Sequence, residues 1–220
     1  RKLAHEIKNP LTPIQLTIDR LKSKYSEKIA DHEKDDFSKS LLIIGKQIKQ
    51  IENLVNEFSD FARMPKPILK DNNLVSLIKD NIKLINELDN KIIIDFKSSK
   101  SDIFLNSDSE QLSRVFFNLI KNSIESIQDK KIDNVNLIGK IDISIIENEE
   151  IINFIIIDNG LGFGIFENNI KDILNPYFTT KKTGTGLGLS IVNKIINDHN
   201  GKINFVSLGS GARIEIVFIK

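Results

Sequence analysis

The chain opens with two stretches whose apolar positions recur at a helical period. Over residues 36–63 the apolar side chains alternate at spacings of four and three, which is the heptad pattern of a long helix with a seam for a partner helix. These positions are Phe37, Leu41, Ile44, Ile48, Ile51, Val55, Phe58 and Ala62. A similar upstream stripe comprises Leu3, Ile7, Pro10, Ile14, Ile18 and Leu21. Because the charged residues 22–36 between the stripes suit a loop, the pattern predicts an antiparallel helical hairpin.

The seam of this hairpin needs a cover, since a lone hairpin buries too little surface to be stable. Two copies of the chain can supply it by pairing their hairpins as a four-helix bundle, and we favour this homodimer. The alternative is that the seam packs against the rest of the chain.

The pattern changes after MPKP, residues 64–67, where proline ends the second helix. Helical periodicity returns at residues 74–87, 108–128 and 187–199, and Ile- and Phe-rich segments typical of strands occupy residues 91–97, 102–106, 140–147, 151–158, 202–206 and 213–219. This mixture, with antiparallel hairpins towards the end, predicts an α/β sandwich. The fold class is therefore α+β, with a helical hairpin at 1–64, a linker at 65–72 and a second domain at 73–220.

The composition of the chain argues against several classes of function. Hydrophobic residues make up 40% and charged residues 28% of the chain, as in ordinary globular proteins. The net charge of +1 gives no reason to expect nucleic acid or an anionic membrane as a partner. No cysteine and three histidines argue against disulfides and a structural zinc site. No apolar run reaches the ~18 residues of a membrane span, and Arg1 already lies in a helical pattern, so we expect a fragment of a longer protein that does not itself contact the membrane.

The first chemical candidate is His5, which opens the sequence HEIKNP. At about 100° per residue, it lies about 180° from the centre of the first apolar stripe, with Asn9 on the same face. An outward-facing imidazole can act as a nucleophile when a base takes its proton, and Glu6 is the adjacent candidate base. His32, in the charged stretch, and His199, at a helix end, are interpreted as ordinary surface histidines.

Two polar motifs of the second domain suggest a nucleotide site. Asn118 and Asn122 lie four residues apart and so share one helical face, and their amide oxygens are hard ligands suited to Mg²⁺. Asp158 ends a predicted strand, where its carboxylate can accept a hydrogen bond from the exocyclic amine of adenine. Gly160 and Gly162, in the sequence DNGLGFG, permit tight turns and close approach of a ligand. Each motif alone is also compatible with a structural role.

A third motif, TGTGLGLSIV at residues 183–192, places Gly184, Gly186 and Gly188 just before a predicted helix. Glycine-rich backbone leading into a helix N-terminus presents free N–H groups and the positive end of the helix dipole, which together bind phosphate. The preceding TTKK, residues 179–182, adds hydroxyls and cations. The long connection before it is typical of a lid.

Together these motifs resemble those of the sensor histidine kinases of two-component systems. AHEIKNPLTPIQL is similar to their H box, NLIKNSIES to the N box, DNGLGFG to the G1 box, PYFTTK to the F box and GTGLGLSIV to the G2 box. The resemblance spans nearly the whole chain, and within the family it is closest to the NtrY-type kinases of nitrogen regulation. It implies a dimerising hairpin that carries the phosphorylated histidine, followed by a Bergerat-type ATP-binding domain.

The resemblance also implies a role for each site residue. It makes His5 the phospho-acceptor, Glu6 its base and Asn9 the residue that orients water for dephosphorylation of the partner. It assigns Mg²⁺ to Asn122 and adenine to Asp158. The remaining ATP-binding positions are Asn118, Gly160, Gly162, Phe178 as the lid anchor, Thr180, Lys181, Gly184, Gly186, Leu187 and Gly188. The implied partner is the receiver domain of an NtrX-like response regulator, and the implied location is the cytoplasmic side of a bacterial inner-membrane protein.

Three rival functions share this kind of pocket. The ATPases with this nucleotide fold carry a water-activating glutamate where this chain has Asn118, and an amide cannot take a proton. Serine kinases of the anti-sigma type lack an HExxNP hairpin. A degenerate scaffold that only binds nucleotide and sequesters a regulator is the non-enzymatic alternative. One departure from the kinase pattern is Glu125, which stands where many members have a phosphate-contacting lysine.

Overall fold

The structure is a computed structural model that describes residues 2–88, 91–163, 172–179 and 184–220, without the side chains of residues 2–6, 8, 31, 60 and 88. The chain divides into two compact units. The first comprises Arg1–Met64 with Thr180–Leu187, and the second comprises Pro65–Thr179 with Gly188–Lys220.

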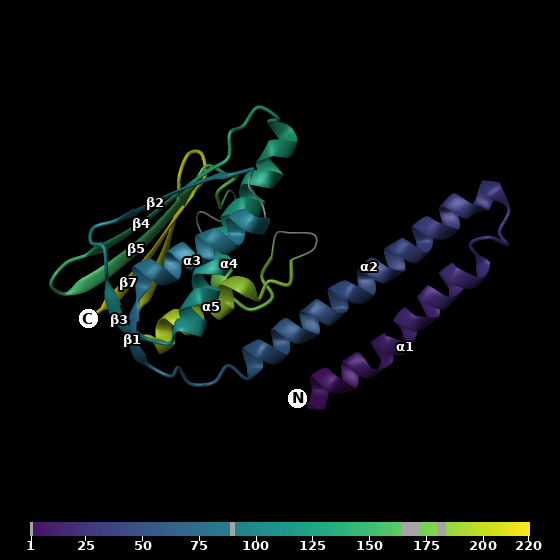
Figure 1. Ribbon diagram of the computed structural model, residues 1–220, viewed down its shortest axis with the longest axis horizontal. Helices are drawn as coiled ribbons and strands as arrows, with labels where there is room; N and C mark the ends of the chain where they lie inside the picture. Colours follow the sequence, from purple (N-terminus) through teal and green to yellow (C-terminus); the bar gives the residue numbers. More distant parts are fainter. Residues whose placement is uncertain (1, 89–90, 164–171, 180–183) are drawn as a thin grey trace. The chain divides into compact units, whose positions relative to one another are not determined.

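The first unit contains the predicted helical hairpin (Figure 1). Helix α1 spans Lys2–Tyr25 and α2 spans Asp31–Ala62. Their shared core consists of Leu11, Ile18, Leu41 and Ile48, with Leu21 and Phe37 packed against it. The predicted hairpin is therefore confirmed, but the connection is shorter than predicted, since both helices extend into the charged stretch. The charged residues 22–36 include no glycine or proline that would end a helix. An ion pair between Lys39 and Asp35, one turn apart at 2.5 Å, supports the first turns of α2.

Only part of the predicted apolar seam of α2 is buried within the hairpin. On α2, Leu41, Ile48 and Val55 are buried, at intervals of seven residues, whereas Ile44 and Ile51 remain 44% and 42% exposed. The hairpin thus keeps an apolar strip uncovered along α2.

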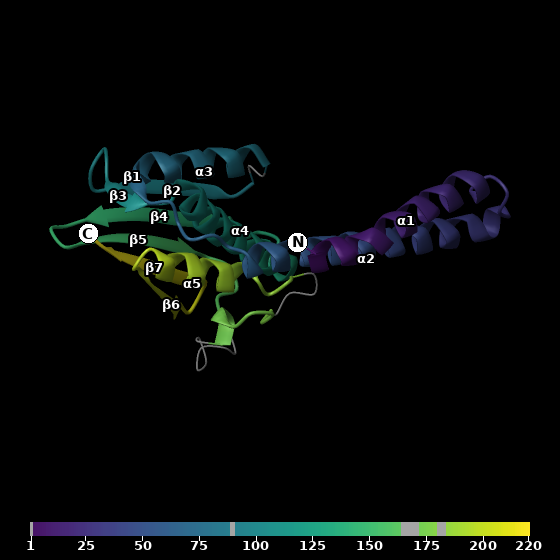
Figure 2. The same ribbon diagram turned by 90° about the horizontal axis from the view of Figure 1, so that it is seen from below.

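The second unit is built on a five-stranded sheet with the order β2-β4-β5-β7-β6. Its strands are β2 (Ile93–Ser98), β4 (Lys140–Glu147), β5 (Ile151–Asp158), β6 (Lys202–Ser207) and β7 (Ala212–Ile219). Edge strand β2 pairs in parallel with β4, and the other pairs are antiparallel. Helices α3 (Leu74–Leu88), α4 (Ser109–Asp133) and α5 (Gly188–Asp198) lie on one face of this sheet, as Figures 1 and 2 show.

The core lies between that sheet face and the three helices. Alternate residues of β5 are buried, as expected when only one sheet face is covered. Phe154 of β5 stacks on Phe116 of α4, with ring centroids 4.8 Å apart. Because α4 lies across the sheet beside the end of β5, it is the helix that can bring side chains to Asp158.

Two features of this unit differ from the sequence-based predictions. Strand β1 (Lys70–Asn73) was not predicted, and it pairs with β3 (Phe104–Ser107) in a separate two-stranded sheet. The interpretation of His199 as a surface residue is wrong, because its side chain is only 7% exposed. His199 Nε2 accepts a hydrogen bond from the backbone N–H of Asp108 at 2.9 Å, and Nδ1 lies 2.8 Å from Ile195 O. The imidazole thereby ties the end of α5 to the start of α4.

Within the described part of the chain, no helix has the length and apolar character that a membrane span requires.

Candidate functional site

Asp158 forms the floor of the candidate site at the end of β5. Its side chain is 5% exposed, and Oδ1 accepts a hydrogen bond from Gly160 N at 2.9 Å. Burial raises the pKa of this carboxyl, an effect that the N–H of Gly160, the hydroxyl of Ser123, the N–H of Ala212 and the charge of Lys130 partly offset. Ser123 Oγ is near enough to contribute, yet it completes no hydrogen bond among the described residues. The result is a buried acceptor beside a buried hydroxyl.

The turn after Asp158 is pressed against neighbouring backbone, which explains its glycines. A Cβ at Gly160 would lie 2.4 Å from Ser126 Oγ of α4, and that oxygen accepts a hydrogen bond from Leu161 N at 3.0 Å. Gly162 has φ +74, and its Cβ would lie 2.6 Å from Gly211 O. The turn can approach its neighbours this closely only because these positions have no side chain.

Helix α4 carries both predicted asparagines. Asn118 and Asn122 are half-buried, next to residues that face the sheet. Asn122 directly precedes Ser123, the α4 residue whose hydroxyl lowers the pKa of Asp158. Among the residues that the structure describes, no group of three or more His, Asp or Glu side chains forms a metal site. The neutral amide oxygen of Asn122 nevertheless fits Mg²⁺ that is also bound by phosphate oxygens, since that ion retains few protein ligands.

The candidate phospho-acceptor lies on the other unit. The backbone of His5 and Glu6 belongs to α1, which is continuous through Pro10 and Pro13. The side chains of His5 and Glu6 lie outside the described part, so the predicted outward orientation of His5 stays a prediction. Asn9, one turn later, is exposed.

The glycine-rich segment is described in part. Thr180 and Lys181 lie outside the described residues, and so does most of the predicted lid. Phe178 is half-buried, and its N–H donates to Asn175 O at 3.2 Å. Gly188 begins α5, as expected for a phosphate-binding helix N-terminus.

The last residues of this segment before α5 belong to the first compact unit. Gly184 is exposed, Gly186 has φ +70 and Leu187 is buried. The left-handed backbone at Gly186 is one that glycine adopts readily and other residues rarely do.

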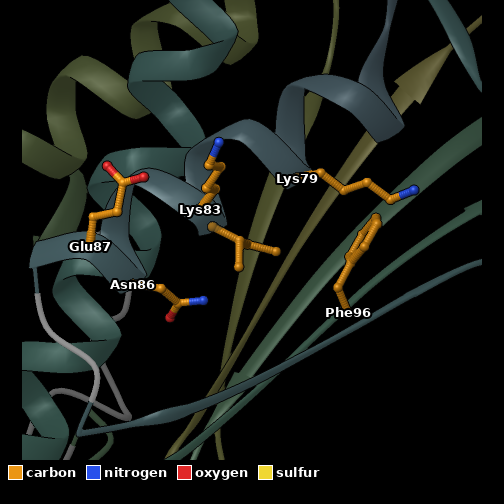
Figure 3. Close-up of a pocket in the computed structure, with 6 residues that line it drawn as sticks. Lys79, Lys83, Asn86, Glu87 and Phe96 are labelled. Carbon is orange, nitrogen blue, oxygen red and sulfur yellow. The ribbon is translucent and has the colours of Figure 1, made fainter.

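Two surface hollows lie away from these residues. One, of about 410 Å³, lies between α3 and β2 and is lined by Lys79, Ile82, Lys83, Asn86, Glu87 and Phe96 (Figure 3). The other, of about 600 Å³, is lined by residues of α3 and the first turns of α4. Neither includes Asp158 or the two asparagines, so we do not assign the nucleotide site to them.

The sequence motifs left out two residues that contact this site. Ser123 has a weak signal, because it follows Asn122 and falls on the buried face of a periodic helix. Lys130 has no such signal: its Nζ donates to Asn159 O at 2.9 Å and to Gly160 O at 2.8 Å, partners that only the fold brings together.

Comparison with known proteins identifies two domains. Residues 107–220 match the family "Histidine kinase-, DNA gyrase B-, and HSP90-like ATPase", and residues 1–67 match "His Kinase A (phospho-acceptor) domain". The chain is 36% identical over 219 residues to an NtrY-like sensor histidine kinase of Rickettsia felis, covering 99% of this chain and 35% of that protein. It is also 36% identical to the nitrogen regulation protein NtrY of Azorhizobium caulinodans, covering 98% of this chain and 28% of that protein.

A solved structure has the same fold. The histidine kinase ThkA, in complex with the response regulator protein TrrA, matches with a TM-score of 0.69 and 27% identity. The match covers 100% of this chain and 60% of the ThkA chain. The chain spans about a third of the length of the curated relatives that it matches.

Proposed function

Because the chain belongs to the family of histidine kinase-, DNA gyrase B- and HSP90-like ATPases and carries a His Kinase A domain, we propose that it is the catalytic part of a two-component sensor histidine kinase. In this proposal the chain transfers the γ-phosphoryl group of ATP to His5 and then to an aspartate of a response regulator. The observation that carries it is the buried carboxylate of Asp158, set beneath a glycine turn beside the helix that bears Asn122.

The nucleotide end of the proposal rests on Asp158. Its buried acceptor suits the exocyclic amine of adenine, and the buried Ser123 hydroxyl lies beside it. Asn122, with Asn118 one turn before it, would hold Mg²⁺, which neutralises phosphate charge when bound. The backbone from Gly184 to Gly188 would bind the phosphates.

The acceptor end of the proposal rests on α1. A ring nitrogen of His5 would form a bond to the γ-phosphorus while the bond from that phosphorus to the β–γ bridging oxygen breaks, which releases ADP. Glu6 would take the ring proton and fix the tautomer. Transfers of this kind depend on positioning and charge neutralisation more than on covalent catalysis by the protein. Asn9 would orient water when the regulator is dephosphorylated.

The partners follow from the hairpin and from the relatives. The uncovered apolar strip at Ile44 and Ile51 suits a second copy of the chain, which would complete a four-helix bundle. The ThkA complex with TrrA supports a receiver domain as the second partner. The similarity to NtrY-type proteins suggests an NtrX-like regulator, and a full-length protein anchored in the inner membrane with this part in the cytoplasm.

Simple ATP hydrolysis is the rival function in this family. Asn118 stands where the ATPases of this fold have a glutamate, and its amide cannot accept a proton from water. Release of phosphate without a phosphorylated intermediate would favour the rival.

The experiment compares γ-labelled ATP incorporation into the unaltered chain and three variants in the presence of Mg²⁺. We expect His5→Gln to abolish labelling while nucleotide binding persists, and Asp158→Ala to abolish labelling because binding is lost. His32→Gln is the matched control, since the His32 side chain is 80% exposed and lies 27 residues from His5 in the sequence. This variant should label normally. Labelling of the His5→Gln chain at the normal level would reject the proposal.

A further inference from the structure

Lys130 lies in the last turn of α4, where its ammonium group joins two loops that adjoin the candidate site. Its Nζ donates to Asn159 O at 2.9 Å, to Gly160 O at 2.8 Å and to Ser210 Oγ at 2.8 Å. A lysine ammonium has three N–H donors, so these contacts use all of them. Two acceptors belong to the turn after Asp158, and the third belongs to the turn before β7.

The turn that Lys130 holds is the one that fixes Asp158. Gly160 contributes its carbonyl to Lys130 and its N–H to Asp158 Oδ1, at 2.9 Å. The same peptide segment therefore connects the ammonium of Lys130 to the buried carboxylate. Hydrogen bonds from a charged donor are about twice as strong as neutral ones, so they suit the task of holding a glycine-rich turn.

Lys130 holds this turn together with contacts from β4, from the loop before β4 and from α4. Asn159 is held by β4, because Lys140 N donates to Asn159 Oδ1 at 2.9 Å and Asn159 Nδ2 donates to Ile138 O at 2.8 Å. Leu161 is held by Ser126 Oγ. Between them, the carbonyl groups of Asn159 and Gly160 accept from Lys130, while the N–H groups of the same two peptide planes donate to Asp158 Oδ1 and Ser126 Oγ.

We propose that Lys130 is a positioning residue for base recognition: it holds the Asp158–Gly160 turn so that the side-chain oxygen of Asp158 faces the adenine amine as a fixed acceptor. This inference rests on the proposed function, since it assumes that Asp158 binds adenine. Lys130 touches neither the phosphates nor the acceptor histidine in this scheme, so it acts on nucleotide selection and not on phosphoryl transfer.

A charge effect accompanies the positioning. The groups that set the pKa of Asp158 are its burial, the N–H groups of Gly160 and Ala212, the Ser123 hydroxyl and the ammonium of Lys130. Among these described groups Lys130 is the one that carries a charge. Loss of that charge would raise the pKa of Asp158 further and so favour its protonated form.

The experiment measures calorimetric affinities of the 220-residue chain for ATP and GTP as a function of pH. For Lys130→Met we expect ATP affinity to fall about tenfold, the order of one charge-assisted hydrogen bond. GTP affinity should change little, because guanine has a carbonyl where adenine has its amine. The acid limb of the ATP-affinity profile should move to higher pH, because loss of the ammonium charge raises the pKa of Asp158.

Two further variants separate positioning from general stability. Lys131→Met removes the neighbouring lysine, which makes no hydrogen bond or ion pair among the described residues, and should leave both nucleotides and the pH profile unchanged. Lys130→Arg keeps the positive charge. Its ATP affinity should therefore lie close to that of the unaltered chain, and the acid limb of its pH profile should stay at the pH found for the unaltered chain.

The outcomes distinguish this inference from the proposed function. Lys130→Met with normal ATP affinity and a normal pH profile overturns the role of Lys130 and leaves the proposed function intact. Equal losses of ATP and GTP affinity, with no pH shift, also overturn it, because they indicate a purely structural role. If the unaltered chain binds no ATP, the proposed function fails and the inference with it.

Discussion

A Cβ atom at Gly211 would lie 1.8 Å from the main-chain oxygen of Asp158. Gly211 also has φ +102, a backbone conformation that residues with a side chain rarely adopt. The start of β7 therefore presses on the backbone that presents the candidate base-binding carboxylate, and only glycine fits at this contact.

Gly211→Ala should consequently disturb both stability and nucleotide binding. We expect the free energy of unfolding to fall by about 1–3 kcal/mol from backbone strain alone, with a further loss from the contact with Asp158. Gly209→Ala is the control, because nothing lies within 4 Å of its Cβ. Chemical denaturation and calorimetric titration of both variants measure the effect, and equal behaviour of the two would contradict this account of the turn.

Asp158→Asn separates binding from stability. Burial raises the pKa of Asp158 above its ordinary 3.8, so the folded chain binds this proton more tightly than the unfolded chain. The stabilising contribution is thus fully present below pH 3.8 and is lost as pH rises through the folded-state pKa. The amide carries no such cost at neutral pH, so we expect unchanged or higher unfolding free energy together with weaker ATP binding. Normal ATP affinity in this variant would count against the adenine site.

His199→Ala should destabilise the second unit. The buried imidazole bonds both the start of α4 and the end of α5, and its removal leaves the Asp108 N–H without its acceptor. We expect a loss of about 1–3 kcal/mol in the free energy of unfolding. His32→Ala should have no measurable effect, because that side chain is 80% exposed. Similar thermal melting curves for the two variants would show that the buried bridge contributes nothing.

Much of the fold could be predicted because its elements have strong local patterns. Strands β4 and β5 begin and end at the predicted residues, since both are Ile-rich and a turn at Asn148 separates them. Strand β1 could not be predicted, because its sequence KDNN is polar and its pairing with β3 supplies the reason for its conformation. The hairpin connection was overestimated because charged residues resemble a loop even when they continue a helix.

The candidate site likewise contains residues with a local sequence signal and residues that only long-range contacts identify. Asp158 and its glycines could be identified because DNGLGFG, a carboxylate followed by a glycine-rich turn, is a local signal at a strand end. The buried face of α1 was predicted less well: Ile14 belongs to the predicted apolar stripe but is 45% exposed, whereas Leu11, which the stripe omits, is buried. The role of Lys130 depends on contacts with residues 29, 30 and 80 positions away, which no local pattern contains.

The uncovered strip of the hairpin predicts the oligomeric state. Replacing both Ile44 and Ile51 by Glu should convert the dimer to monomer, because the paired hairpins would have to bury four charges without partners. Leu42→Glu is the control: Leu42 is 58% exposed but lies about 170° around α2 from the midpoint of Ile44 and Ile51. Sedimentation analysis gives the mass of each variant. A dimer that survives the double change would favour the alternative in which the seam packs within the chain.

The central claim is that nucleotide bound by the second domain phosphorylates the histidine on α1. The most direct measurement is mass-spectrometric mapping of the 220-residue chain after incubation with ATP and Mg²⁺, with parallel tests of stability in acid and alkali. We predict one phosphoryl group on His5, lost in acid and retained in alkali. An acid-stable phosphate, or a phosphoryl group mapped to any other residue while His5 stays unmodified, would contradict the account.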